Sequence, residues 1–143
     1  MMERDGYSDE EIKSILSLKN IAVVGISRDA SKDAHIVPRY LMENGYNIIP
    51  VNPFADEVLG KKAYKSLLDV PDTVRIDVVD VFRPSEQVYQ VVKEAIAKGV
   101  KAIWLQLGIY NKEAVEEAVK YDIKVVYNRC MMQEHKRLYI WKR

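Results

Sequence analysis

The sequence predicts an α/β protein, with a doubly wound sheet of about five mainly parallel strands and helices on both faces. Apolar runs of strand length alternate along the chain with segments whose apolar residues recur at helical spacing. These runs are nearly continuous, which is typical of strands covered on both faces of a parallel sheet. Right-handed crossovers between such strands then give the doubly wound arrangement.

The elements expected in the first half of the chain follow from capping residues, periodicity and turn residues. Ser8 and Glu11 have the spacing of a capping box, which opens a helix with an apolar face. Gly45 stands where a helix that starts near Ala34 needs a C-terminal cap. In order, we expect a helix from Ser8 that buries Ile12, Ile15 and Leu16, a strand at 21–26, a helix at 34–44, a strand at 46–51, and an irregular stretch at 52–72 with one helical turn at 66–68.

The second half continues the alternation. Residues 76–82 form an apolar run that only aspartates interrupt, and Gly99 closes a helix whose valines recur at helical spacing. Trp104 stands in the middle of an apolar run, so we expect it in the core. In order, the elements are a strand at 76–82, a helix at 85–98, a strand at 102–107, a helix at 112–121, a strand at 124–127 and a short helix at 130–137.

Composition and charge narrow the class of protein. The chain has 143 residues, of which 48% are hydrophobic and 30% charged, as expected for one globular domain spanning 1–143. Its 22 basic and 21 acidic residues nearly cancel, so the net charge favours neither nucleic acid nor an anionic membrane surface. No apolar run has the length of a membrane span, the N-terminus lacks a signal-peptide pattern, and the single cysteine excludes an internal disulfide. We therefore expect a cytoplasmic protein that binds neither nucleic acid nor membrane.

The stretch Ile21-Ala-Val-Val-Gly-Ile-Ser27 carries the strongest functional signal. It is a strand that breaks at Gly25, and a helix begins a few residues later. Such a turn brings free backbone N–H groups and the positive end of the helix dipole to one point, which suits an anion such as a phosphate. The competing interpretation is that the glycine only turns the chain and that the nearby charges are solvated. The polar side chains of the loop are those of Ser27, Arg28, Ser31 and Lys32.

The same loop argues against a dinucleotide. The G-x-G-x-x-G fingerprint needs glycines at three positions that here hold Gly25, Ser27 and Ala30. The strand at 46–51 ends in Asn52-Pro53, without the acid that binds a ribose hydroxyl. No Gly-Lys-Ser/Thr follows the first glycine, so the P-loop of nucleoside triphosphate enzymes is missing from this position as well. NAD is therefore disfavoured.

Ligands of a doubly wound sheet bind beyond the carboxyl ends of the strands, where the strand order reverses. Four of the five expected strand ends carry a polar group beside an apolar residue or a glycine, which fits a ligand with a charged part and an apolar part. Taken alone, Asn52-Pro53 is also a turn signal, Phe82 a core residue, and Arg83 a surface residue at a helix entry. The five ends are Gly25-Ile-Ser-Arg28, Asn52-Pro53, Phe82-Arg-Pro84, Gln106-Leu-Gly108 and Asn128-Arg-Cys130.

A string of short motifs includes these strand ends: Val24-Gly-Ile-Ser-Arg-Asp-Ala-Ser-Lys32, Val37-Pro-Arg-Tyr-Leu41, Gly45-Tyr-Asn-Ile-Ile-Pro-Val-Asn-Pro53, Asp80-Val-Phe-Arg83, Trp104-Leu-Gln-Leu-Gly-Ile109, Arg129-Cys130 and Glu134-His135. In this order they resemble the stand-alone coenzyme A (CoA) binding domains, which are related to the CoA-binding domain of succinyl-CoA synthetase alpha subunits. The resemblance covers residues 15–138 and depends on the whole string. The family usually has Asp where this chain has Asn128, and often Pro where it has Ala30.

The resemblance implies a Rossmann-like domain that binds CoA, free or acylated, at the carboxyl edge of the sheet. It places the CoA phosphates on the loop at 27–32, and the adenosine and pantetheine parts beside Asn52-Pro53 and Phe82-Arg83. Arg would offer a forked donor to phosphate, Phe82 an apolar or stacking surface, and Gln106 hydrogen bonds to amide or ribose groups. The expected cofactor-binding residues are Gly25, Ile26, Ser27, Arg28, Ser31, Lys32, Asn52, Pro53, Phe82, Arg83, Pro84, Gln106 and Gly108.

Two classes of function remain open at this stage. The first is non-catalytic binding of CoA or an acyl-CoA, as a carrier, a sensor or a regulator of an acyl-CoA enzyme. The second is an NAD(P)- or acyl-CoA-dependent enzyme on the same fold. The sequence offers no Ser-His-Asp/Glu grouping, metal-ligand cluster or paired carboxylates at the expected ligand edge, which favours the binding module. A protein partner is not specified, and the C-terminal aromatic residues are compatible with a monomer or a homodimer.

Cys130 is the one candidate for covalent chemistry. It follows the last strand near a helix N-terminus, and Arg129 beside it would favour the thiolate. Such a thiolate would exchange with a CoA disulfide and form a mixed disulfide. The alternative is a small buried side chain, which is the commoner situation of a free cysteine. Just beyond it, residues 135–137 (His, Lys and Arg) are expected on a solvated surface.

Overall fold

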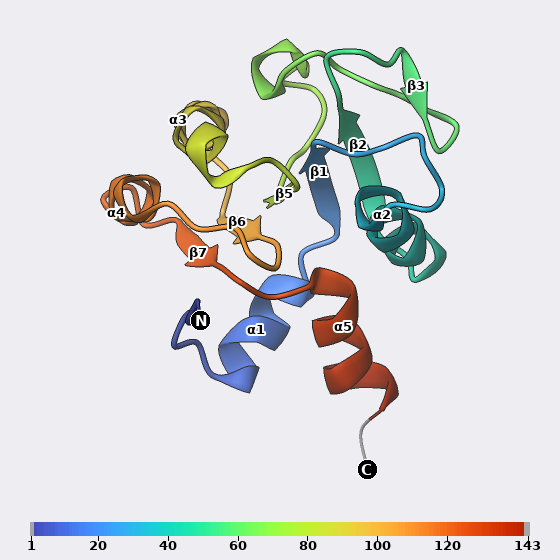
Figure 1. Ribbon diagram of the computed structural model, residues 1–143. Coiled ribbons are helices and arrows are strands. Elements are labelled where there is room, and N and C mark those ends of the chain that lie inside the picture. The colour runs from blue at the N-terminus through green and yellow to red at the C-terminus, as the bar shows by residue number, and fades with distance from the viewer. Residues whose placement is uncertain (1, 142–143) are drawn as a thin grey trace.

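The computed structural model describes residues 2–141 and contains the predicted doubly wound sheet (Figure 1). Five strands pair in parallel, in the spatial order β2-β1-β5-β6-β7. Their side chains are almost all buried, because helices cover both faces, and this explains the continuous apolar runs. The strands are β1 (Asn20–Val24), β2 (Asn47–Val51), β5 (Val78–Val81), β6 (Ala102–Leu105) and β7 (Lys124–Val126).

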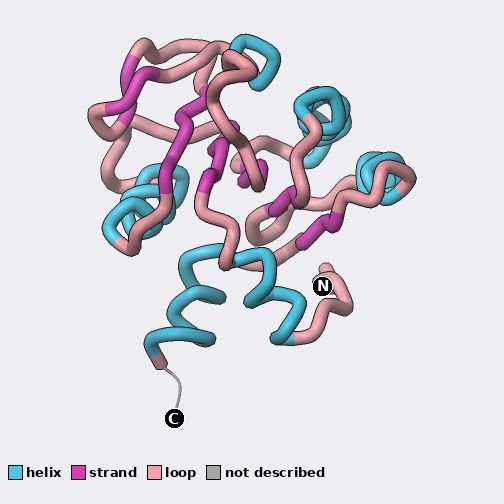
Figure 2. The backbone as a smooth tube through the Cα atoms, turned by 180° about the vertical axis from the view of Figure 1, so that it is seen from behind, coloured by secondary structure: helices cyan, strands magenta, loops and turns pink. Residues whose placement is uncertain are grey.

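Helices cover both sides of the sheet (Figures 1 and 2), and a hydrophobic core lies on each side. One core joins the sheet to three helices and includes Trp104, which is fully buried as predicted and donates its indole N–H to the Arg129 carbonyl at 2.9 Å. The other core joins the sheet to two helices and includes Val79 and Ile103. The first core involves α1 (Asp9–Leu16), α2 (Asp33–Glu43) and α5 (Met131–His135), and the second α3 (Val88–Lys98) and α4 (Lys112–Val119).

The predicted capping box at the start of α1 is confirmed. The Ser8 hydroxyl accepts a hydrogen bond from the Glu11 backbone N–H at 3.2 Å, and the Glu11 carboxylate accepts one from the Ser8 backbone N–H at 3.1 Å. The predicted apolar face of this helix is buried against the sheet, with Ile12, Ile15 and Leu16 in the core.

The stretch at 52–72 is more ordered than the sequence suggested. Leu59 and Gly60 both have positive φ angles, 55° and 73°, which is the requirement of a tight hairpin turn. They join β3 (Glu57–Val58) to β4 (Lys61–Lys62) in an antiparallel pair. A 3₁₀ helix at Leu67–Asp69 occupies the place of the predicted helical turn.

The chain from β7 to the C-terminus also differs from the prediction. After α5 the helix continues as a π-helix at Lys136–Ile140 instead of ending at 137. The expectation that His135 lies on a solvated surface is wrong, because its side chain is only 8% exposed and one ring nitrogen lies 2.7 Å from the Tyr40 hydroxyl. The cause is the packing of α5 against α2, which carries Tyr40. Lys136 and Arg137 are partly exposed.

A buried arginine ties the two ends of the described chain together. The Arg129 guanidinium donates to the Asp5 carboxylate at 2.8 Å and to the Glu134 carboxylate at 2.7 Å, and all three side chains are buried. Arg137 extends the network, since it bridges Glu134 and Asp9. The N-terminal arm is thereby held against the last strand and α5.

The helices of residues 2–141 include none that is long and apolar enough to cross a membrane. The strand order reverses between β1 and β5, because β2 lies on the other side of β1 while β6 and β7 follow β5. A sheet of this kind binds its ligands where the strand order reverses, so we expect the ligand site beyond the carboxyl ends of β1 and β5.

Candidate functional site

Gly25 and Phe82 bring the ends of β1 and β5 into close contact. Gly25 has a φ angle of +89°, and a Cβ atom there would lie 2.6 Å from the Phe82 carbonyl oxygen and 2.9 Å from Cδ of Arg83. Its backbone N–H donates to the Val51 carbonyl at the end of β2, at 3.0 Å. Only glycine fits this position, so the sequence signal at Gly25 reflects a close approach of strand ends as well as a turn.

The loop after Gly25 is fixed by backbone hydrogen bonds. The Ser27 N–H donates to the Ala34 carbonyl at 3.0 Å, and Nδ1 of His35 donates to the Ser27 carbonyl at 2.7 Å. The Asn52 amide donates to the Ile26 carbonyl at 2.9 Å, so Asn52 supports the loop from β2. The Ile26 side chain is fully buried in the core beside α2, so Ile26 can contribute to a ligand site through its backbone only.

The polar side chains of this loop are partly engaged with one another. The Ser27 hydroxyl accepts from the Asp29 N–H at 3.0 Å, and the Ser31 hydroxyl donates to the Asp29 carboxylate at 2.7 Å. Hydrogen bonds from the hydroxyl and the backbone N–H of Ser31 lower the pKa of the Asp29 carboxyl. Arg28 and Lys32 are exposed and form no ion pair with any residue of the described chain.

The start of α2 contributes backbone donors to the same place. Within residues 2–141, the N–H groups of Asp33 and Ala34, in the first turn, make no backbone hydrogen bond, as is usual at a helix N-terminus. Charges in the loop cancel, since the Asp29 and Asp33 carboxylates match the two cations. An anion here would therefore be held by directed N–H donors and the helix dipole together with individual cations, and not by net charge.

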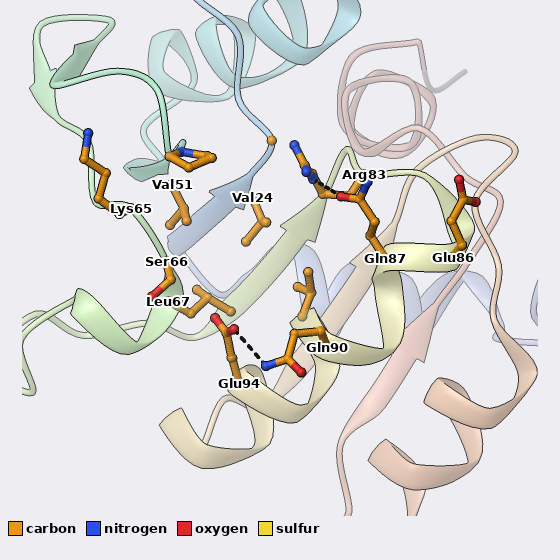
Figure 3. Close-up of a pocket in the computed structure, with 13 residues that line it drawn as sticks. Val24, Val51, Lys65, Ser66, Leu67, Arg83, Glu86, Gln87, Gln90 and Glu94 are labelled. Carbon is orange, nitrogen blue, oxygen red and sulfur yellow. Dashed lines mark hydrogen bonds between the residues drawn. The ribbon is translucent and has the colours of Figure 1, made fainter.

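Two pockets lie on either side of the point where β1 and β5 meet. The first, which we call the β2/α3 pocket, has a volume of about 400 Å³. Val24, Val51 and Leu67 form its apolar floor, and polar side chains from α3 and from the segment before the 3₁₀ helix surround it (Figure 3). The polar residues of its wall are Lys65, Ser66, Arg83, Glu86, Gln87, Gln90 and Glu94.

The second pocket, which we call the α2/α5 pocket, has a volume of about 420 Å³. Arg83 lines both pockets and so stands in the wall between them, where its Nε donates to the Gln87 side chain at 2.8 Å. The other residues of the α2/α5 pocket are Asp33, Ala34, Val37, Phe82, Pro84, Gln106, Leu107, Ile109, Cys130, Met132 and Gln133.

The site residues predicted from the sequence are distributed over the two pockets. Gly25, Pro53 and Arg83 line the β2/α3 pocket, and Phe82, Arg83, Pro84 and Gln106 line the α2/α5 pocket together with Cys130. The four polar loop residues at 27, 28, 31 and 32 line neither pocket, and Gly108 lies outside both, with its N–H bonded to the Asn128 side chain. Sequence reasoning missed the residues that come from the irregular stretch and from α5: Lys65, Ser66, Leu67, Met132 and Gln133.

A fully buried carboxyl group lies behind the α2/α5 pocket. Asp80 in β5 shares a sheet face with Phe82, and its Oδ1 accepts a hydrogen bond from Nε2 of Gln106 at 2.5 Å. Its Oδ2 has no partner in the described chain. Burial raises the pKa of this carboxyl to about 7, against the effect of the Gln106 hydrogen bond. Gln106 was expected to hydrogen-bond the ligand, and because Asp80 engages its NH₂ group, its side-chain oxygen is the atom left for that role.

Of the two interpretations of Cys130, the surroundings of its side chain favour the buried residue over the reactive thiolate. Burial raises the pKa of its thiol, and the carboxylate of Asp80 acts in the same direction. Arg129 does not counter this effect, because its guanidinium is buried and engaged by two carboxylates. The neutral thiol is therefore favoured, and Cys130 is a half-buried wall residue of the α2/α5 pocket.

Comparison with known proteins shows a consistent set of relatives. Residues 19–136 match the family described as CoA binding domain. A Bacillus subtilis (strain 168) protein named YneT, described as uncharacterized, is 40% identical over 129 residues, which cover 90% of this chain and 94% of that protein. The ADP-forming acetate–CoA ligase II of Archaeoglobus fulgidus is 32% identical over 126 residues, which cover 87% of this chain and 18% of the ligase. A solved structure of a hypothetical protein from Pyrococcus horikoshii OT3 has a TM-score of 0.89 at 46% identity and covers 96% of this chain and 99% of that chain.

Proposed function

The chain belongs to the CoA-binding domain family, and we propose that it binds CoA across the carboxyl edge of its sheet, with the two ends of the ligand in different pockets. The observation that carries this proposal is the pair of pockets joined at Arg83. CoA has a nucleotide at one end, phosphates in the middle and a pantetheine arm at the other end. One cation between two pockets matches that order of groups.

The chemistry of the two pockets suggests which end goes where. The β2/α3 pocket combines an apolar floor, formed in part by Val51 and Leu67, with amide and hydroxyl groups around it, which suits a base and a ribose. Arg83 and the N–H groups at the start of α2 suit the phosphates. The α2/α5 pocket has fewer polar groups and suits the end of the pantetheine arm, whose last amide can donate to the oxygen of Gln106.

We assign the protein a binding role, as a carrier, a sensor or a regulator of an acyl-CoA enzyme. Two potential catalytic groups at the edge are poorly suited to chemistry. The Cys130 thiol has a raised pKa, and the Asp80 carboxyl is enclosed and bonded to Gln106. The related acetate–CoA ligase is a longer protein, and the part that matches this chain is 18% of its length.

Titration of CoA and of its two halves tests the bridging arrangement. If one ligand spans both pockets, 3′,5′-ADP and 4′-phosphopantetheine should each bind at least about 100-fold more weakly than CoA, because the covalent link makes the second contact intramolecular. Binding of 3′,5′-ADP as tight as that of CoA would show that the arm lies outside a pocket. Failure of CoA to bind would refute the proposal as a whole.

A variant of Arg83 tests its position between the pockets. Arg83→Met should weaken CoA binding about tenfold or more, since a hydrogen bond to a charged group is worth about 1.5–3 kcal/mol. Arg39→Met is the matched control, because Arg39 is an exposed residue of α2 that pairs only with Glu43 among the described residues. Equal affinities of the two variants would remove Arg83 from the site.

A further inference from the structure

The α2/α5 pocket is more apolar than the end of a pantetheine arm requires. Side chains from four segments meet there, among them Phe82 after β5, Leu107 and Ile109 after β6, and Met132 of α5. Leu107 is 60% exposed although it is a large apolar residue. Apolar side chains gathered around a pocket at a ligand edge indicate that part of the ligand is apolar as well.

The pocket is also larger than the arm's end. Its volume of about 420 Å³ equals that of roughly a dozen water molecules at about 30 Å³ each. The thiol end of CoA beyond its last amide consists of two methylene groups and a sulfur atom. A thioester with a few further carbon atoms would fill the remaining space.

The charges around the pocket disfavour a carboxylate on that acyl group. Asp80 lies behind the wall with one oxygen unpartnered in the described chain, and Asp33 lies at the pocket's edge. Arg83 is the one cation that lines the pocket among residues 2–141, and under the proposed function the phosphates engage it. A ligand carboxylate here would be repelled by Asp33 and would find no unengaged cation to pair with.

We infer that the α2/α5 pocket receives the acyl group of a short, uncharged acyl-CoA and discriminates against acyl groups that end in a carboxylate. This inference rests on the proposed function and deepens it, because it specifies the class of ligand. Phe82, Leu107, Ile109 and Met132 would contact the acyl chain, and the Asp80–Gln106 pair would bound the pocket on the sheet side.

Titration of free CoA, acetyl-CoA, butyryl-CoA and succinyl-CoA tests the inference. Each added methylene that is buried should tighten binding about fourfold, so butyryl-CoA should bind about 15-fold more tightly than acetyl-CoA. Butyryl-CoA and succinyl-CoA have nearly the same shape, and we expect the butyryl ligand to bind at least about tenfold more tightly. Equal affinity for acetyl- and butyryl-CoA, or binding of succinyl-CoA as tight as that of butyryl-CoA, would overturn the inference while CoA binding itself stands.

A variant at the exposed part of the wall locates the effect. Leu107→Ser should lower the ratio of butyryl-CoA to acetyl-CoA affinity at least about threefold. Val119→Ser is the matched control, since Val119 is a similarly exposed apolar residue in α4 that lines neither pocket. An unchanged ratio in Leu107→Ser would mean that the acyl chain lies elsewhere and would overturn the inference. Failure of every CoA ligand to bind would overturn the proposed function, and this inference with it.

Discussion

The buried carboxyl of Asp80 makes the stability of the protein depend on pH in an unusual direction. In the unfolded chain an Asp loses its proton near its ordinary pKa of 3.8, whereas in the fold the pKa of Asp80 is raised to about 7. As the pH rises through this interval, the unfolded state releases its proton first, so the free energy of unfolding falls. The stabilising effect of the protonated group is complete below about pH 4 and is lost as the pH rises to about 7.

Asp80→Asn removes this titration and keeps the shape of the side chain. With these two pKa values, linkage predicts that the free energy of unfolding of the unchanged protein lies below its value at full protonation of Asp80. The decrease is about 2 kcal/mol at pH 5.5 and about 4 kcal/mol at pH 8.5. The free energy of unfolding of Asp80→Asn minus that of the unchanged protein should therefore rise by about 2 kcal/mol between these pH values. Urea unfolding curves followed by circular dichroism at several pH values measure this difference.

Asp77→Asn is the matched control, because Asp77 is also a buried aspartate of the same segment. Its pKa is lowered by hydrogen bonds from Asn20 and Arg75, which outweigh the effect of burial. Asp77 is ionised in both the folded and the unfolded chain above about pH 5.5. The difference in free energy of unfolding between Asp77→Asn and the unchanged protein should therefore be constant over the same pH range. A constant difference for Asp80→Asn as well would refute the reasoning, and it would mean that Asp80 ionises as an ordinary carboxyl.

Three further predictions concern the ligand edge. Gly25→Ala should lower the free energy of unfolding, measured in urea, by about 2–4 kcal/mol, which is more than the effect of Gly60→Ala. Both glycines have positive φ, but only a side chain at Gly25 would clash with Phe82, so equal effects of the two variants would contradict the close approach. Lys32→Ala should weaken CoA binding about tenfold at low salt without lowering stability, and an unchanged dissociation constant would identify Lys32 as a solvated charge. Cys130 should react with iodoacetamide at pH 8 more slowly than free cysteine does, owing to its raised pKa; a rate equal to that of the free amino acid would argue against a buried thiol.

The sheet and its covering helices could be predicted because their signals are local. Apolar runs, helical periodicity and caps such as Ser8 with Glu11 depend on residues close in sequence, and the sheet follows from them. The hairpin at 57–62 escaped prediction for the same reason. Its strands have two residues each, too few to show a period, and the positive φ of Leu59 has no sequence signature.

The features of the site that prediction missed depend on partners distant in sequence. Arg129 was expected to activate its neighbour Cys130, but its charge is engaged by Asp5, which lies 124 residues earlier. Gln106 was expected to hydrogen-bond a ligand, and the sequence did not indicate that the parallel register of β5 and β6 brings Asp80 within hydrogen-bond distance of its NH₂ group. Neither partner has a pattern that points to the other in one sequence.

Calorimetric titration of the protein with CoA and with NADH tests the central claim most directly. The two ligands share an adenosine diphosphate unit and differ in the 3′-phosphate of CoA and in the group beyond the diphosphate, which the α2/α5 pocket would receive. We predict that CoA binds at least about tenfold more tightly than NADH, because the loop lacks two glycines of the dinucleotide fingerprint and β2 ends without an acid. NADH binding as tight as that of CoA would contradict the account.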